Sequence, residues 1–337
     1  MKAEQVFACA GRPRLRADVV AGVLFIRGWE GDTVRVEDCI GAEVKQKGSN
    51  IYLESSSRCS CKIYLPRNSD VFVDGTHLEI DLGGIWGEGR FDFTQGSLVA
   101  ENWVGDLAVD CTGASVALRQ CQGKAEIDSA GGSVDIFSSS GSFVCDTGSG
   151  SVTVRDSTGS VFADTGSGTV TVAQFSGPVH IDTGRGDVTL QSVFGRNVFA
   201  DCGDGSISAI LPGIVPGRWE LATRSGDISL EVPENISARF EFRGKVLDVG
   251  EIHLSSQNRE PHFVSGSLGR GEGAIIASSP VGKIRAYPIP PASNEVRWQV
   301  QDEESLKILR MLEQGSISID EADKLLAALN GEARNEG

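Results

Sequence analysis

The chain has 337 residues, of which 40% are hydrophobic, 7% are aromatic and 42 are glycine. Its formal net charge of −15 argues against binding to nucleic acid or to an anionic membrane surface, because both need clustered Lys and Arg side chains. The N-terminal residues lack the apolar core of a secretory signal, and no run is long enough to span a membrane. We therefore expect a cytoplasmic protein.

Residues 1–73 are predicted to form the irregular first coils and the cap of a repeat. The stretch GVLFIRGWEGDTVRVED contains two alternating apolar strands around the turn from Gly28 to Gly31. Further short apolar strands follow, with Ser, Pro and Asn between them. A cap is required because an open end would expose unpaired strand edges and apolar core.

A period of eighteen residues organises residues 74–230 of a predicted β-solenoid that covers residues 74–285. Asp146 opens the line DTGSGSVTVRDSTGSVFA, and Asp164 opens DTGSGTVTVAQFSGPVHI. The aspartates that open such lines are Asp74, Asp92, Asp110, Asp128, Asp146, Asp164, Asp182 and Asp201. A fixed period of this size is the signature of a solenoid. We predict an all-β fold, a single-stranded parallel β-helix with eighteen residues per coil.

Each coil divides into two nine-residue halves, each a corner followed by a short strand. In the coil that begins at Asp146 the corners contain Gly150 and Gly159, which we explain by positive φ or by a lack of room for a Cβ atom. The alternation Val-Thr-Val predicts one face inward and one outward. The predicted inward set includes Ile127, Val134, Ile136, Val152, Val154, Val161, Val170, Val172, Val179, Ile181, Val188 and Leu190.

The chain changes character towards its C-terminal end. Residues 231–285 continue as strands with looser spacing, which predicts the last coils and a closing cap. Residues 286–300 contain Pro288, Pro290 and Pro291 and are typical of an extended linker.

Residues 301–331 predict a hairpin of two short helices. Gly315 suits the end of the first helix, and Ser318 with Glu321 forms a capping box at the start of the second. The apolar side chains along the two helices are Leu306, Leu309, Leu312, Leu325, Leu326 and Leu329. Because so small a hairpin is not stable alone, we predict that it is a docking or oligomerisation module.

The aspartate that opens each coil is the first candidate for chemistry. Stacked carboxylates repel unless backbone N–H groups or a shared cation satisfy them, and we favour an Asx-turn, in which the aspartate accepts hydrogen bonds at a corner. Calcium-binding β-roll repeats place an aspartate two positions before the inward apolar residue, where this chain has Gly150, Gly168 and Gly186. We expect no metal site, and the sequence leaves open whether the aspartate column binds a cation.

An outward apolar row on the second strand of each coil is the candidate interaction surface. Its members are Val144, Phe162, His180 and Phe199. Such a stripe is unusual on a monomer, so either the C-terminal region or a partner covers it. We interpret His180 as a packing residue. A separate outward array of Thr153, Thr171 and Thr189 is interpreted as ordinary strand residues rather than an ice-binding surface.

No catalytic arrangement stands out in the sequence. A sugar-cleaving β-helix needs carboxylates that converge on one outer face, whereas Asp187 with Arg185, and Lys124 with Glu126, are isolated pairs. The chain has no nucleophile elbow and no phosphate-binding loop, so we expect neither an enzyme nor a cofactor.

The eight cysteines are irregularly spaced, and we expect them to be reduced. Cys59 and Cys61 would lie on one face of a strand, but a metal site there lacks nearby histidines and a second cysteine pair. We expect Cys145 to be a small core residue.

The repeated units resemble a known family. DTGSGSVTV and DTGSGTVTV are similar to the coils of the bacterial putative-adhesin β-solenoid family of unknown function, and the resemblance covers about residues 15–285. KILRMLEQGSISIDEADKLLAAL resembles the SHOCT-like hairpin of cell-envelope stress proteins of the LiaX type, in which the hairpin comes first rather than last. The resemblance implies a right-handed β-helix, an envelope-associated role in sensing, scaffolding or adhesion, and no established catalytic site.

These observations predict a non-enzymatic β-solenoid that acts as an interaction scaffold in cell-envelope stress or adhesion. Its partner would be another protein or a second copy held through the C-terminal hairpin, with peripheral association with the envelope. The alternative is a carbohydrate-binding or carbohydrate-cleaving β-helix, which a groove with converging carboxylates and exposed aromatic side chains would favour. The irregular segments at both ends argue against end-to-end polymerisation.

Overall fold

The computed structural model describes residues 4–213, 215 and 217–290. The chain divides into two units, Met1–Ile289 and Pro290–Gly337. Apart from Pro290, the second unit lies outside the described residues, and so do the predicted hairpin and most of the predicted linker.

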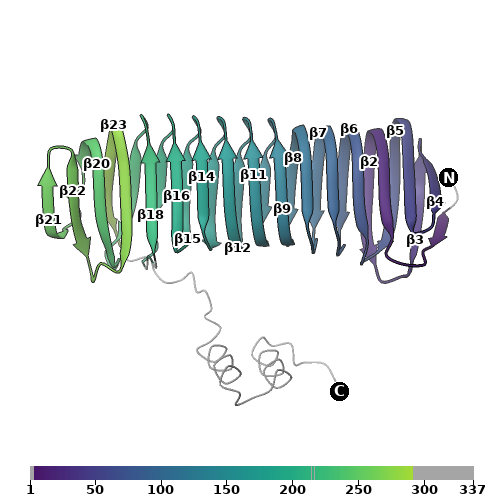
Figure 1. The fold of residues 1–337 in the computed structure, drawn as a ribbon, viewed down its shortest axis with the longest axis horizontal. Helices are drawn as coiled ribbons and strands as arrows, with labels where there is room; N and C mark the ends of the chain where they lie inside the picture. Colours follow the sequence, from purple (N-terminus) through teal and green to yellow (C-terminus); the bar gives the residue numbers. More distant parts are fainter. Residues whose placement is uncertain (1–3, 214, 216, 291–337) are drawn as a thin grey trace, which may run out of the picture. The chain divides into compact units, whose positions relative to one another are not determined.

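The described residues form a sheet of 23 strands, which lie side by side along the stack in Figure 1. The strands are β1 (Gln5–Ala8), β2 (Arg14–Trp29), β3 (Thr33–Ile40), β4 (Glu43–Lys47), β5 (Asn50–Pro66), β6 (Asp70–Gly83), β7 (Gly89–Glu101), β8 (Leu107–Arg119), β9 (Gln122–Ser129), β10 (Val134–Phe137), β11 (Ser140–Thr147), β12 (Val152–Thr165), β13 (Val170–Ser176), β14 (Val179–Thr183), β15 (Val188–Phe194), β16 (Asn197–Cys202), β17 (Ile207–Ile210), β18 (Arg218–Thr223), β19 (Ile228–Pro233), β20 (Ala238–Asp248), β21 (Ser255–Glu260), β22 (Phe263–Leu268) and β23 (Gly273–Ile289).

Consecutive coils stack in parallel and build two walls. The first, here called the aspartate wall, contains the N-terminal parts of β2 and β5 to β8, then β9, β11, residues 158–165 of β12, β14, β16 and β18. The second, here called the threonine wall, contains β10, residues 152–155 of β12, β13, β15, β17 and β19. Long strands such as β12 turn the corner and belong to both walls.

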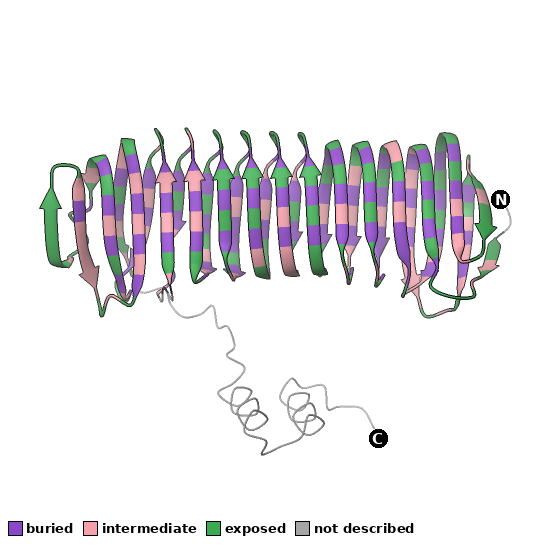
Figure 2. Cartoon of the chain, viewed as in Figure 1, coloured by how far each residue is buried: buried purple, intermediate pink, exposed green. Residues whose placement is uncertain are grey.

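The eighteen-residue period is confirmed by the strand register. Asp146 lies opposite Asp128 on one side and Asp164 on the other, and Asp201 lies opposite Asp182 although that coil has one extra residue. Every member of the predicted inward set is at most 3% exposed. Figure 2 shows the resulting alternation of buried and exposed bands along the strands. The all-β solenoid and its thin apolar interior are therefore as predicted.

Both explanations for the corner glycines hold. Lack of room applies at both corners, since a Cβ atom at Gly159 would lie 1.8 Å from the carbonyl oxygen of Gly141. At Gly159 φ is +124°, a conformation that side chains rarely adopt. At Gly150 a Cβ atom would lie only 1.8 Å from the carbonyl oxygen of Gly132 in the preceding coil. A further set of corner residues, which was not predicted, has φ between 49° and 54° without being glycine: Asn102, Gln120, Ser138, Asp156, Gln174 and Ser192.

The chain enters and leaves the stack out of sequence order. β2 lies in parallel between β5 and β6, with Asp18 opposite Asp74. At the other end β23 lies between β18 and β20. Regular stacking therefore begins near Arg14, earlier than the sequence period indicates, because β3 and β4 interrupt the period in the sequence but not in space.

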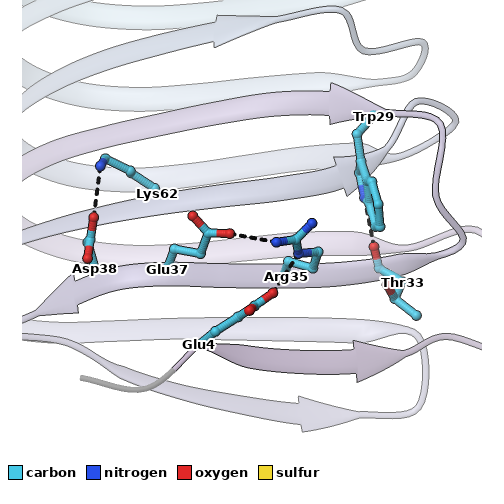
Figure 3. Close-up of polar contacts among 7 residues, drawn as sticks. All are labelled: Glu4, Trp29, Thr33, Arg35, Glu37, Asp38 and Lys62. Carbon is cyan, nitrogen blue, oxygen red and sulfur yellow. Dashed lines mark hydrogen bonds and ion pairs between the residues drawn. The ribbon is translucent and has the colours of Figure 1, made fainter. Parts of the chain in front are cut away.

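Antiparallel strands cover both ends of the stack, as expected of caps. β1 pairs with β3, and β3 and β4 pair with β5, whereas β22 lies between β20 and β21. Arg35 of β3 donates hydrogen bonds to Glu4 at 2.6 Å and to Glu37 at 2.8 Å (Figure 3). Lys62 of β5 donates to Asp38 at 2.8 Å, and this bond lowers the pKa of the Asp38 carboxyl. The Lys62–Asp38 contact fastens the N-terminal cap to β5, whereas the two contacts of Arg35 lie within the cap.

The expectation that all cysteines are reduced is wrong for one pair. Cys39 and Cys61 form a disulfide, because the antiparallel pairing of β3 with β5 brings them together. The other cysteines of the described chain are free, and Cys145 is buried as predicted. Among the described residues no group of three or more His, Cys, Asp and Glu side chains could hold a metal ion.

Candidate interaction surface

The predicted outward apolar row lies on the aspartate wall. Val144 is opposite Phe162, Phe162 is opposite His180, and His180 is opposite Phe199. These four residues are called the outer row below. Phe162 is 42% exposed, His180 is exposed, and the other two are half-buried. The strands that carry the row, β11, β12, β14 and β16, are neighbours in Figure 1.

The rings of the outer row are stacked on one another. The ring centroids of Phe162 and His180 are 5.0 Å apart with an angle of 3° between the planes, and those of His180 and Phe199 are 4.7 Å apart at 13°. Parallel strands at about 4.8 Å impose this spacing on identical positions of successive coils. The ring faces therefore cover one another, and the ring edges point outward. His180 packs as predicted.

Charged residues bound the outer row at both ends. Beyond Val144 the same column continues with Glu126 and then Ala108, and beyond Phe199 it continues with Glu220. Glu126 forms an ion pair with Lys124, and Glu220 forms one with Arg218. The apolar part of this column is thus confined to the central coils.

A column of carboxylates runs beside the outer row, two residues further along each strand. Ten carboxylates stack in register and are called the aspartate ladder below: Glu54, Asp18, Asp74, Asp92, Asp110, Asp128, Asp146, Asp164, Asp182 and Asp201. At about 4.8 Å per step the ladder is roughly 43 Å long. Glu54 and Asp18 were not predicted as members, although Asp18 shares the apolar-x-apolar-Asp pattern of Asp74, with Leu15 and Ala17 before it.

The predicted Asx-turn role of these aspartates is wrong. Asp146 and its equivalents lie within strands and point outward, and within the described part of the chain no side chain of the nine ladder aspartates has a hydrogen bond or an ion pair. The next residue takes the corner role instead. The hydroxyl of Thr147 donates to the carbonyl of Gly150 at 2.7 Å, and Thr165 does the same to Gly168 at 2.9 Å. The pattern Asp-Thr-Gly-Ser-Gly thus combines an outward carboxylate with an inward corner hydroxyl.

Burial and mutual repulsion shift the pKa of two aspartates of the ladder, Asp164 and Asp201. Burial, followed by the carboxylates of Asp146 and Asp182, raises the pKa of Asp164, and His180 partly opposes this. Burial and Asp182 likewise raise the pKa of Asp201. Charge at these positions is therefore disfavoured in the folded protein relative to an isolated aspartate.

A shallow hollow of about 410 Å³ opens where the column of the outer row narrows to Ala108. Its lining includes Asp110, Asp128 and Glu126, and Arg90 lies on the other side of Ala108 from Glu126. The hollow forms because Ala108 is the smallest side chain in this column and lies between the long side chains of Arg90 and Glu126. It combines an apolar floor with carboxylates at its edge.

The threonine wall carries the second predicted array. Thr153, Thr171 and Thr189 stack in register, with Asp135 before them and Ser208 after them. The isolated pairs considered for catalysis have local contacts: the Asp187 carboxylate accepts a hydrogen bond from the backbone of Ser206 at 2.7 Å, and Lys124 pairs with Glu126. The six leucines of the predicted hairpin lie outside the described residues.

Parallel coils with an outer row beside a long carboxylate ladder define an all-β solenoid with a patterned outer face. A model of the family Toastrack DUF4097 matches residues 43–275, and the chain belongs to this family. A model described as a SHOCT-like domain matches residues 303–334. No curated protein matches the chain at a significant level.

Three solved structures are similar to the chain. A putative cell adhesion protein from Clostridium sporogenes has 11% identity and a TM-score of 0.17, with 85% of this chain and 99% of that chain covered. A putative adhesin from Parabacteroides distasonis has 10% identity and a TM-score of 0.33, with 85% and 96% covered. A putative adhesin from Bacteroides fragilis has 12% identity and a TM-score of 0.25, with 84% and 96% covered. Within the described residues, no helix is long and apolar enough to cross a membrane.

Proposed function

We propose that the protein is a non-enzymatic interaction scaffold, in which the solenoid presents the outer row to a protein partner and the C-terminal SHOCT-like domain docks or oligomerises. This function would serve adhesion or the response to cell-envelope stress. The proposed interaction residues are those of the outer row together with Leu306, Leu309, Leu312, Leu325, Leu326 and Leu329.

The observation that carries this proposal is the exposure of the outer row. Stacked rings bounded by charged residues form an apolar stripe on a surface whose other outward positions are mostly polar, and such stripes mark interaction sites. Phe162, at 42% exposure, lies at the centre of this stripe. Its neighbours in the wall hold it in place, so the partner meets a preformed surface.

The hollow beside Ala108 supports the alternative of carbohydrate binding, because carboxylates and apolar surface meet there. The outer row argues against that alternative. Sugar rings stack on the faces of aromatic side chains, and here the faces of Phe162, His180 and Phe199 are turned towards one another. We therefore place the protein partner first.

Light scattering on the full chain and on a chain ending at Asn294 tests the proposal. We expect an oligomer from the full chain and a monomer from the shortened one, as an assembly module at the C-terminus requires. Two monomers would exclude self-association through the hairpin. An identical oligomer from both chains would assign assembly to the solenoid, and Phe162→Ser would then be expected to dissociate it.

Location is also a proposal. We propose peripheral association with the envelope. The Cys39–Cys61 disulfide counts against the expected cytoplasmic location, because such bonds persist mainly in oxidising compartments, and it offers a direct test. Trapping of free thiols in intact cells should find both cysteines reduced if the chain is cytoplasmic. An oxidised pair would instead indicate that the protein lies on the outer side of the membrane.

A further inference from the structure

We infer that the aspartate wall binds a basic amphipathic helix of a partner protein, with the apolar side of the helix on the outer row and its Lys and Arg side chains along the aspartate ladder. This inference rests on the proposed function, since it names the chemistry of the partner for the same surface.

Charge complementarity is the first argument. The ladder places ten carboxylates on one line, and of these only Glu54 has a basic partner among the described residues, Lys45 at 3.3 Å. Carboxylates about 4.8 Å apart repel one another, and cationic side chains laid along the line would relieve this repulsion. The chain carries a net charge of −15, so long-range attraction also favours a basic partner.

The outer row is the second argument, because it determines where the apolar side chains of the partner must lie. Phe162 and Asp164 are two residues apart on one strand, which separates the outer row and the ladder by about 7 Å. On a helix, side chains three or four residues apart are about 5–6 Å from one another. A helix with an apolar stripe beside a basic stripe therefore covers both columns at once.

The spacing of the coils favours a helix over an extended strand. A helix lying along the stack presents side chains of one face every 5.4 Å or so, close to the 4.8 Å step between coils. An extended segment presents them about every 6.7 Å, and it loses register after two coils. Across the outer row, a helix stays within about 2 Å of register.

The hollow at Ala108 supplies an anchor at one end of this surface. Its apolar floor suits the aliphatic stem of a lysine, and the carboxylates of Asp110 and Asp128 lie at its rim. The C-terminal segment of the chain is a poor occupant of the wall, because residues 291–337 contain ten acidic and five basic side chains. A separate basic protein segment is the partner that fits the wall.

Fluorescence anisotropy with the full chain tests the inference. The probe is a short labelled Leu–Lys peptide designed as an amphipathic helix, compared with its Leu–Glu counterpart and with deca-lysine. We expect the Leu–Lys peptide to bind best and the Leu–Glu peptide not to bind. The ladder variant Asp146→Asn/Asp164→Asn/Asp182→Asn should weaken Leu–Lys binding about tenfold.

A matched control variant removes the same charge elsewhere. Glu79→Gln/Asp135→Asn/Asp156→Asn changes three exposed carboxylates outside the aspartate wall and should leave the affinity within about twofold of the original. The variant Phe162→Ser/Phe199→Ser should weaken binding of the Leu–Lys peptide but not of deca-lysine, because only the former contacts the outer row.

Equal losses of affinity for the Leu–Lys peptide in the ladder and control variants would overturn the inference, since binding would then depend on net charge alone. A solution mass that falls to that of the monomer in Phe162→Ser/Phe199→Ser would also overturn it, by assigning the wall to a second copy. Light scattering is measured without peptide. The two measurements are therefore independent. If the chain forms an oligomer through the hairpin but does not bind the peptide, this inference is overturned and the scaffold proposal stays in place.

Discussion

At the scale of single residues, the sequence motif separates into positions with different physical tasks. In Asp-Thr-Gly-Ser-Gly the carboxylate of Asp146 points outward, the hydroxyl of Thr147 closes the corner, and Gly150 lets the preceding coil approach. Each position is under a constraint that a conservative substitution would violate. Two substitutions are the most informative. One adds a clashing Cβ atom at a close approach of two coils, and the other removes a repulsive charge from the ladder.

Gly150→Ala should lower the free energy of unfolding by about 3 kcal/mol. The added Cβ atom would lie 1.8 Å from the carbonyl oxygen of Gly132, which belongs to backbone and cannot move aside without disturbing the stack. Urea denaturation measures the change. Gly250→Ala is the control, because a Cβ atom there meets nothing within 4 Å, and its effect should stay within about 0.5 kcal/mol. Equal effects at both positions would contradict the close approach of the coils.

Asp164→Asn should stabilise the protein at neutral pH. The folded-state pKa of Asp164 is raised by burial and by its two ladder neighbours, so ionisation weakens the folded state as pH rises through that pKa. Asparagine removes this cost. The gain should disappear below about pH 4, where the wild-type carboxyl is protonated in both states. Denaturation at several pH values measures it.

The control for this measurement is Asp135→Asn on the threonine wall, where the neighbours are Ala117 and Thr153 rather than carboxylates. It should leave the free energy of unfolding unchanged at every pH value measured. A destabilised Asp164→Asn at neutral pH would show that the ladder charges have favourable partners, in disagreement with the structure.

At the scale of elements, the coil is the unit that the sequence predicts well. The spacing of Asp128, Asp146 and Asp164 determines the register, and the alternation of valines determines which side chains are buried. The ends were harder to predict, because β2 and β23 join the stack next to strands that are distant in sequence. The local periodicity of the sequence does not indicate that a strand inserts between two strands distant from it in the chain. The Cys39–Cys61 bond depends on an antiparallel register that a bulge shifts, and it was missed for the same reason.

Deleting one coil should be tolerated. Removal of residues 146–163 joins Cys145 to Asp164, so the stack closes with every wall position in register and the protein should keep its strand content and cooperative unfolding. Circular dichroism and urea denaturation measure both. Removal of residues 146–167 is the matched control. It leaves a coil four residues too short to close, and it should cost about 3 kcal/mol or more. Equal stability of the two deletions would contradict eighteen-residue coils.

At the scale of the whole molecule, stacking of the coils aligns each outward repeat position into a long column of side chains. The alignment of the outer row in one column could be predicted from the sequence, because one repeat position determines all four residues, and its role as an interaction surface stays a prediction. The continuous ladder and the hollow at Ala108 were not predicted, because both depend on how the irregular first coils join the regular ones. The proposed role follows from the two columns together, since neither an apolar row nor a line of carboxylates alone specifies a partner.

The most direct test of this account is the NMR spectrum of the histidine rings during titration with the Leu–Lys peptide. The chain has four histidines, His77, His180, His253 and His262, and only His180 belongs to the outer row. If the peptide lies on the outer row, the ring signals of His180 shift on binding while those of the other three histidines stay in place. Two results would contradict this. Either the protein is saturated with peptide while the ring signals of His180 stay in place, or the ring signals of all four histidines shift equally.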